Sequence, residues 1–168
     1  MWNPGFPHVE RRPAELRGYH RAFCVVSYHY RGSPDRPGLV LGLDRGGRCS
    51  GIAYRVTAAD WPGVIAYLDD RELIGYPYRR VILPLDIGSH IVDCCTYVAD
   101  PAHPDYAGGL TADEIARRIT TASGTAGGNR DYLHETVRQM EAHGYDDAGL
   151  RDLARRVNRL AATTAPVP

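Results

Sequence analysis

The sequence contains no lysine, since all 20 of its basic residues are arginine and they balance 20 acidic residues. Without lysine, Schiff-base catalysis and a Walker-type phosphate lysine are both excluded. The formal net charge of zero provides no overall attraction to nucleic acid or to an anionic membrane. We therefore expect neither as a partner.

Long apolar runs are also missing. No segment approaches the roughly 20 residues that span a bilayer, and the start of the chain does not have the form of a signal peptide. The cysteines are few and show no CxxC spacing: Cys24, Cys49, Cys94 and Cys95. We interpret them as buried thiols of a cytoplasmic protein. The seven histidines lack HxxxH and HExxH spacing, so no metal site is expected.

The length of 168 residues, with 18 glycines and 12 prolines, predicts one domain of the α+β class with short strands and many turns. We expect residues 1–18 to be loop-like and residues 162–168 to fray. Strands are predicted in five segments, of which the second and third form a hairpin around Asp44–Gly47: 21–30, 39–43, 49–56, 79–86 and 90–99.

Helices are predicted mostly in the second half of the chain. Thr111 and Glu114 have the spacing of a capping box, which predicts a helix from Thr111 to about Gly124. The other expected helices are 59–73, 129–143 and 148–161. Because the strand half lacks βαβ alternation, a doubly wound sheet is excluded in favour of a small mixed β-barrel or sheet with helices packed around it.

The stretch YLDDRELIGY at residues 67–76 places a carboxylate, Glu72, at the end of an apolar helical segment. Its apolar neighbours Leu73, Ile74 and Tyr76 are expected to raise the pKa of Glu72 toward neutrality by desolvation, which suits general acid–base catalysis.

A purely structural Glu72 is the alternative interpretation. In that case Glu72 is solvated at the helix end and ion-paired with Arg71 or Arg79. Asp69 and Asp70 are expected to be solvated or to act as capping residues.

Two loops carry further candidates. Arg31 opens the segment RGSP and is suited to bind a carboxylate with two parallel hydrogen bonds, or else it is a loop arginine that bonds to backbone carbonyls. The glycine-rich segment 123–129 precedes a helix, so its N–H groups offer a place for an anion, although a plain interhelical turn is favoured. A dinucleotide site is not expected, because no strand precedes these glycines.

Several segments together resemble the ChaC family of γ-glutamylcyclotransferases, in the family's order and over almost the whole chain: WNPGF at 2–6, RGSPDRPGLV at 31–40, the Glu72 segment, ADP at 99–101, DYAGG at 105–109 and GNRDYL at 128–133. The resemblance implies a γ-glutamylcyclotransferase-like fold and a glutathione-specific carbon–nitrogen lyase that forms 5-oxoproline and cysteinylglycine without a cofactor. It implies that Glu72 is catalytic and that the Tyr132 hydroxyl faces the substrate.

In such a reaction the α-amine of the substrate attacks its own γ-carbonyl, so no enzyme nucleophile is needed. We assign both proton transfers to Glu72, which takes a proton from the ammonium and gives one to the leaving nitrogen. Tyr132 is predicted to bind the α-amine or the α-carboxylate, and a tyrosine of the core is the alternative. Tyr78 is a weaker candidate, based on its nearness to Glu72.

One feature departs from the family. A Tyr-Gly-Ser-Leu loop, which holds the γ-glutamyl group there, would precede Met1 and Trp2 and is missing from this sequence. Either the start codon has been assigned too late, which we favour, or the chain is a truncated form. The competing functions are a non-catalytic binding module on the same fold and a cyclotransferase for another γ-glutamyl amine.

Overall fold

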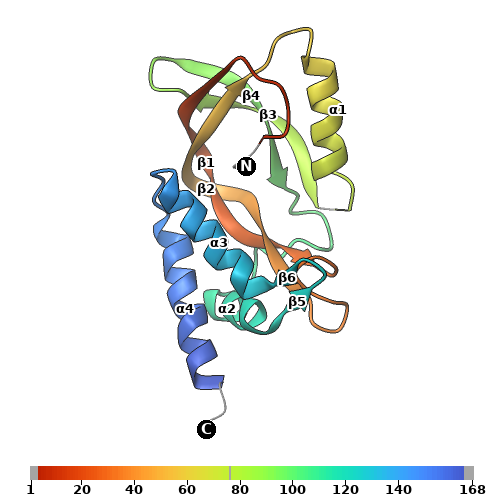
Figure 1. Cartoon of the computed structure of the whole chain (residues 1–168), viewed down its shortest axis with the longest axis vertical. Coiled ribbons are helices and arrows are strands. Elements are labelled where there is room, and N and C mark those ends of the chain that lie inside the picture. The colour runs from red at the N-terminus through yellow and green to blue at the C-terminus, as the bar shows by residue number, and fades with distance from the viewer. Residues whose placement is uncertain (1–3, 76, 165–168) are drawn as a thin grey trace. The chain divides into compact units, whose positions relative to one another are not determined.

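The computed structural model describes residues 4–75 and 77–164, and it has the α+β composition expected from the sequence. Figure 1 shows its elements, which follow in chain order: β1 (Glu10–Ser27), β2 (Gly38–Arg55), α1 (Trp61–Glu72), β3 (Tyr78–Asp86), β4 (Ile91–Ala99), α2 (Ala112–Thr121), β5 (Ser123–Gly124), β6 (Gly127–Gly128), α3 (Asn129–Ala142) and α4 (Ala148–Thr164). No helix among these is long and apolar enough to cross a membrane.

The main sheet has the strand order β2-β1-β3-β4. The β3–β4 pair is antiparallel over its whole length, from Tyr78 opposite Ala99 to Asp86 opposite Ile91. Within the described residues β2 and β4 form the two edges, so the predicted sheet is open and is not a closed barrel. The strands predicted at 79–86 and 90–99 and the helices predicted at 59–73, 129–143 and 148–161 are confirmed to within three residues at each boundary.

The chain divides into two compact units, and each is built from two separate segments. The first comprises residues 1–20 and 43–104, and the second comprises residues 21–42 and 105–168. The first unit therefore contains α1, β3 and β4, whereas the second contains α2, α3 and α4. Both β1 and β2 contribute residues to each unit. The single-domain assignment stays a prediction.

Each unit has its own buried residues. In the first unit these come from β1, α1 and β4 and include Leu16, Val64, Leu68, Val98 and Ala99. In the second unit, β1 and β2 supply buried side chains together with all three helices, among them Phe23, Val25, Leu39, Ile119, Leu133 and Val157. In the helices the buried residues recur every three or four positions, as one helix face requires, whereas adjacent strand residues such as Val98 and Ala99 are both buried.

The prediction of a loop over residues 1–18 was wrong for residues 10–18. They form the first half of β1, where Glu15 pairs with Asp86 and Leu16 pairs with Leu85 of β3. Leu16 is buried at 6% exposure. Pairing with neighbouring strands and this burial outweigh the poor strand propensity of a charged, proline-containing segment.

The predicted hairpin at 39–56 was also wrong. A single strand, β2, runs through the glycine pair Gly46–Gly47, whose φ values are +98° and +67°. Left-handed glycines occur both in hairpin turns and at local distortions inside long strands, and the local sequence does not distinguish the two. Here the Gly46 carbonyl lies 3.0 Å from Nδ1 of His20 in β1.

In the helical half, one prediction is confirmed and two helix ends differ from the prediction. The capping box is confirmed, because the Thr111 hydroxyl accepts from the Glu114 N–H at 3.3 Å and the Glu114 carboxylate accepts from the Thr111 N–H at 2.8 Å. However, α2 ends at Thr121, and the segment that follows forms the β5–β6 hairpin. The fraying predicted for residues 162–168 was wrong for residues 162–164, which belong to α4, and residues 165–168 lie outside the described part.

Candidate functional site

Glu72 is the last residue of α1, and it continues the buried side of that helix. Val64 and Leu68 precede it at intervals of four residues, which places the three side chains on one face. Val64 is 4% exposed, Leu68 is 8% exposed, and the Glu72 side chain is 24% exposed. The carboxylate therefore lies where an apolar stripe reaches the helix end, as the sequence predicted.

The Glu72 carboxylate is held by Arg71 through one of its two oxygens. Arg71 donates from Nε at 2.9 Å and from Nη2 at 2.7 Å, both to Oε1. Among the described residues Oε2 accepts no hydrogen bond. This ion pair is the one that the structural interpretation anticipated, while Nε of Arg79, the other partner considered, is buried without a hydrogen-bond partner in the described chain.

The apolar neighbours of Glu72 are only partly where they were expected. Leu73 is 36% exposed and Ile74 is 70% exposed, so both extend into solvent. Tyr76 lies outside the described residues. Gly75 has a φ of +78° and ends the segment after α1 with a backbone conformation that favours glycine.

Arg71 also links Glu72 to other parts of the first unit. Its Nη1 donates to the carbonyl of Pro4 at 3.2 Å and to the hydroxyl of Tyr67 at 3.3 Å. Burial alone would lower the pKa of Arg71, but the hydrogen bonds to Glu72 and Tyr67 raise it more, so this pKa lies above its ordinary value. The N-terminal motif and the Glu72 motif thus meet at one arginine.

Asp69, predicted to be solvated or a capping residue, is half-buried, with 29% of its side chain exposed, and is bound by two side chains. Its carboxylate accepts a hydrogen bond from the Tyr97 hydroxyl at 2.7 Å and pairs with Arg80. Burial, and then the hydrogen bond to Asp69, raise the pKa of Tyr97 well above its ordinary value. Asp70 is exposed. Sequence reasoning missed Tyr97, although the β3–β4 register, which puts Tyr97 opposite Arg80, would have pointed to it.

Tyr78, the weaker candidate, is the first residue of β3 and is half-buried opposite Ala99. It belongs to the same compact unit as Glu72.

Arg31 and Tyr132 belong to the second unit and are brought together there. The guanidinium carbon of Arg31 lies 4.9 Å from the centroid of the Tyr132 ring. The same ring meets buried Phe23 edge-to-face, with centroids 5.6 Å apart. Arg31 Nη1 also donates to the carbonyls of Ala126 at 2.5 Å and Gly128 at 3.5 Å, as the alternative interpretation of Arg31 predicted.

The glycine-rich segment between α2 and α3 uses its N–H groups within the fold. Thr125 N–H donates to the His29 carbonyl at 2.9 Å, and Ala126 N–H donates to the Tyr30 carbonyl at 3.0 Å. Asn129 N–H donates to the Ala122 carbonyl at 3.0 Å. The favoured interpretation of a structural connection therefore fits better than an anion site, although the connection is a short hairpin and not a plain turn.

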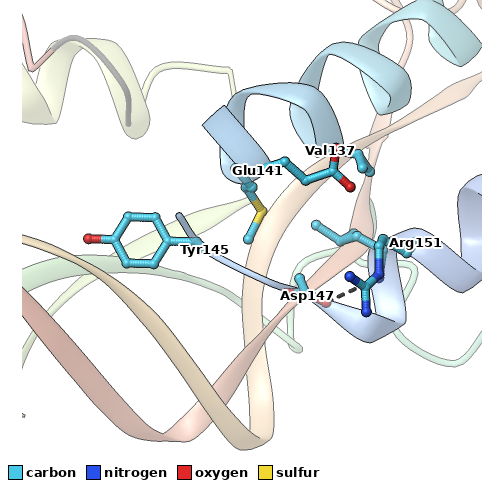
Figure 2. A pocket seen from close by; sticks show the side chains of 7 residues that line it. Val137, Glu141, Tyr145, Asp147 and Arg151 are labelled. Carbon is cyan, nitrogen blue, oxygen red and sulfur yellow. Dashed lines mark hydrogen bonds between the residues drawn. The ribbon is translucent and has the colours of Figure 1, made fainter. Parts of the chain in front are cut away.

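Within the described residues, no group of three or more histidine, cysteine or acidic side chains is placed to hold a metal ion. A shallow pocket lies where α3 ends and α4 begins, lined by Glu141, Tyr145 and Arg151 among others (Figure 2). None of the predicted site residues lines it.

Comparisons with known proteins agree on one family. The family model described as ChaC-like protein matches residues 1–160. The chain is 35% identical to the glutathione-specific γ-glutamylcyclotransferase of Escherichia coli (strain K12) over 167 residues, which covers 99% of this chain and 72% of the relative. It is 31% identical to the protein of the same name from Schizosaccharomyces pombe over 159 residues, covering 82% and 77% of the two chains.

The fold is also that of a solved structure. A crystal structure of the γ-glutamyl cyclotransferase specific to glutathione from yeast matches with a TM-score of 0.76 and 21% identity, and the match covers 92% of both chains. At this identity the likeness establishes the fold alone. Together with the matched family model and the 35% identical relative, it leads to one conclusion: the chain belongs to the ChaC-like protein family.

Proposed function

We propose that this chain is a γ-glutamylcyclotransferase that cleaves glutathione into 5-oxoproline and cysteinylglycine. The observation that carries the proposal is the 35% identity, over 99% of the chain, to the Escherichia coli protein named as a glutathione-specific γ-glutamylcyclotransferase. The four cysteines are free, which supports the reducing cytoplasm as the compartment of this activity.

The proposed reaction rearranges two carbon–nitrogen bonds of the substrate. The α-amine nitrogen attacks the γ-carbonyl carbon and closes a five-membered lactam, while the bond from that carbon to the cysteine nitrogen breaks. Two protons leave the α-ammonium nitrogen, which keeps one hydrogen as the lactam N–H, and two reach the departing nitrogen, which leaves as an amine and ends as an ammonium, so the protons balance without a cofactor. Because both reacting groups belong to one molecule, holding them in the reactive geometry supplies much of the acceleration.

We assign the proton transfers to Glu72. Support comes from the position of the carboxylate at the end of the buried stripe of α1 and from its two oxygens. Oε1 is held by Arg71, whereas Oε2 accepts no hydrogen bond within the described residues and is available to a substrate amine. A carboxylate in this state can accept a proton and return it to the leaving nitrogen.

We propose Tyr132, Arg31 and Tyr78 as substrate-binding residues. For Tyr132, packing of its ring between Phe23 and Arg31 supports a fixed direction for the hydroxyl. For Arg31, Nη1 bonds to backbone carbonyls, but Nε and Nη2 donate to no described residue and could bind a substrate carboxylate. For Tyr78, the support is that it belongs to the same compact unit as Glu72.

The test is incubation of the purified chain with glutathione, with 5-oxoproline measured by mass spectrometry beside the Escherichia coli relative. Glu72→Gln keeps the shape of the side chain and removes the base, so we expect its kcat to fall by about 10²–10⁴-fold. Asp70→Asn is the matched control, because it changes an exposed carboxylate two residues earlier on the same helix. We expect its kcat to equal that of the wild type.

Each outcome has a defined meaning. Near-normal turnover by a folded Glu72→Gln variant would make Glu72 structural and place the proton transfers elsewhere. Faster turnover of γ-glutamylalanine than of glutathione would favour a cyclotransferase for another γ-glutamyl amine. No product from the wild type, under conditions where the relative is active, would favour a non-catalytic binding module. For Tyr132→Phe we expect a raised KM, and unchanged kinetics would remove Tyr132 from the site.

A further inference from the structure

Arg71 is the centre of a cluster in the first unit, formed by Pro4, Gly5, Tyr67, Arg71 and Glu72. Its guanidinium donates to three different acceptors in this cluster: the Pro4 carbonyl, the Tyr67 hydroxyl and Oε1 of Glu72. Its charged carbon lies 5.5 Å from the centroid of the Tyr67 ring. One side chain therefore connects the N-terminal segment, the middle of α1 and the end of α1.

The pairing of Arg71 with Glu72 is not what helix geometry alone would produce. Adjacent residues on a helix point in directions about 100° apart, and only residues three or four apart face each other. Arg71 lies on the same helix face as Tyr67, four residues earlier, and its Nη1 donates to the Tyr67 hydroxyl and to the Pro4 carbonyl. The Nε and Nη2 side of the guanidinium turns toward Glu72. Tyr67 and Pro4 thus direct the guanidinium toward the carboxylate.

Gly5 is required for the N-terminal segment to approach Tyr67 this closely. A Cβ built at Gly5 would overlap the Tyr67 hydroxyl oxygen and would lie 3.2 Å from the ring carbon that carries it. Gly5 also has a φ of +74°, a conformation that other residues rarely adopt. A larger residue would have to displace the Tyr67 hydroxyl, which is one of the groups that hold Arg71.

We propose that Arg71 is a positioning residue for Glu72 and that the Pro4–Gly5 segment, acting through Tyr67, holds Arg71 in place. Both hydrogen bonds from Arg71 go to Oε1, which fixes the rotation of the carboxylate and presents Oε2 for proton transfer. The catalytic meaning of this arrangement rests on the proposed function, in which Glu72 carries the proton.

The first experiment compares three arginine variants in the full chain. Arg71→Met keeps the length of the side chain and removes the fork, so we expect kcat to fall by about 10-fold or more while KM stays within about twofold. Arg71→Lys keeps the charge without the planar fork and should recover part of the lost kcat. Arg155→Met is the control, since Arg155 is exposed and its one ion pair within the described part of the chain is with Asp152 on α4.

The second experiment compares Gly5 with Gly18, two glycines that both have a positive φ but differ in the atoms around them. Gly18 has a φ of +84° and a Cβ there would meet no atom within 4 Å, whereas Gly5 has both the positive φ and the contact with Tyr67. We expect Gly5→Ala to lower kcat several-fold more than Gly18→Ala. In a double-mutant cycle, Gly5→Ala should add little to Tyr67→Phe, because both changes act on the same hydroxyl.

A third readout does not depend on turnover. In protein labelled with carbon-13 at glutamate side chains, the carboxylate resonance of Glu72 is identified by its loss in Glu72→Gln. We expect this resonance to move in Arg71→Met and Gly5→Ala and to stay in place in Arg155→Met and Gly18→Ala. A resonance that stays in place in both Arg71→Met and Gly5→Ala overturns the positioning inference, whether or not the chain cleaves glutathione.

Failure of the inference and failure of the proposed function are therefore separate results. An active wild type with kcat unchanged in Arg71→Met overturns the inference and leaves the activity standing. A wild type without 5-oxoproline production overturns the proposed function, while the resonance of Glu72 still decides whether Arg71 and Gly5 position its carboxylate.

Discussion

Asn129 is the buried polar residue that ties two distant segments of the second unit together. Its side chain is fully buried, with 0% exposure, at the start of α3. Its Oδ1 accepts from the Leu39 N–H at 2.7 Å, and its Nδ2 donates to the Leu39 carbonyl at 2.7 Å. The amide thus satisfies both backbone groups of a buried residue in β2, which makes its own burial favourable.

We predict that Asn129→Ala lowers the free energy of unfolding by about 3 kcal/mol, because two buried backbone groups of Leu39 lose their partners. Urea denaturation followed by circular dichroism measures the change. Asn158→Ala is the control: Asn158 is exposed and bonds to His134 at the surface, so its effect should stay within about 0.5 kcal/mol. A loss below about 1 kcal/mol for Asn129→Ala would show that Leu39 finds other partners.

Prediction of single residues from the sequence was correct where residues nearby in the chain determine the burial and position of a side chain. The sequence placed Glu72 at the end of an apolar helical segment, and in the structure it follows buried Val64 and Leu68 on one face of α1. Prediction failed for Asp69, whose partners Arg80 and Tyr97 come from strands that lie 11 and 28 residues further along the chain. The partner of Asn129, 90 residues away, was equally invisible.

At the scale of single elements, local signals were sufficient for the helices. The capping box at Thr111 marks the start of α2, and Pro62 lies in the first turn of α1, where a missing N–H costs nothing, although Asp60 before it makes no side-chain cap. The long strands were different. Gly46 and Gly47 have the positive φ values expected of a hairpin turn, but they lie inside one continuous strand. Only pairing with a neighbouring strand decides between a turn and a distortion inside β2.

We predict that Thr111→Ala destabilises the protein by about 1 kcal/mol, since the helix loses its N-cap side chain and one half of the capping box. For a chain of this length the expected decrease in Tm is about 2–4 °C. Differential scanning calorimetry gives the value. Thr121→Ala, at the other end of α2, removes a hydroxyl whose partners among the described residues are carbonyls of its own helix, so its Tm should remain close to that of the wild type.

At the scale of the whole molecule, the chain crosses between its two compact units three times. β1 passes from one unit to the other at residues 20–21, β2 passes at residues 42–43, and the third crossing, at residues 104–105, lies in the loop between β4 and α2. Each unit therefore depends on strands that continue into the other, with no linker of loop composition at the two strand crossings. We propose on this ground that the two units unfold together as one domain.

The expected result is a single cooperative transition seen by two probes. In a Trp2→Phe variant the one remaining tryptophan is Trp61, in α1 of the first unit, whereas three of the four helices of the described chain belong to the second unit. Tryptophan fluorescence and far-ultraviolet circular dichroism should therefore report different units. Coincident urea transitions would support one domain, and midpoints that differ between the probes would contradict it.

The sequence by itself determined the α+β class, most helix boundaries, the β3–β4 pair, the capping box and the family resemblance, because each depends on periodicity or on motifs read over a few residues. The tertiary structure decided which segments meet: β1 beginning at Glu10, β2 running through its glycines, Asn129 closing onto Leu39, and Arg71 joining Pro4 and Tyr67 to Glu72. These contacts join residues far apart in the chain, and their stability comes from burial and pairing that no local pattern encodes.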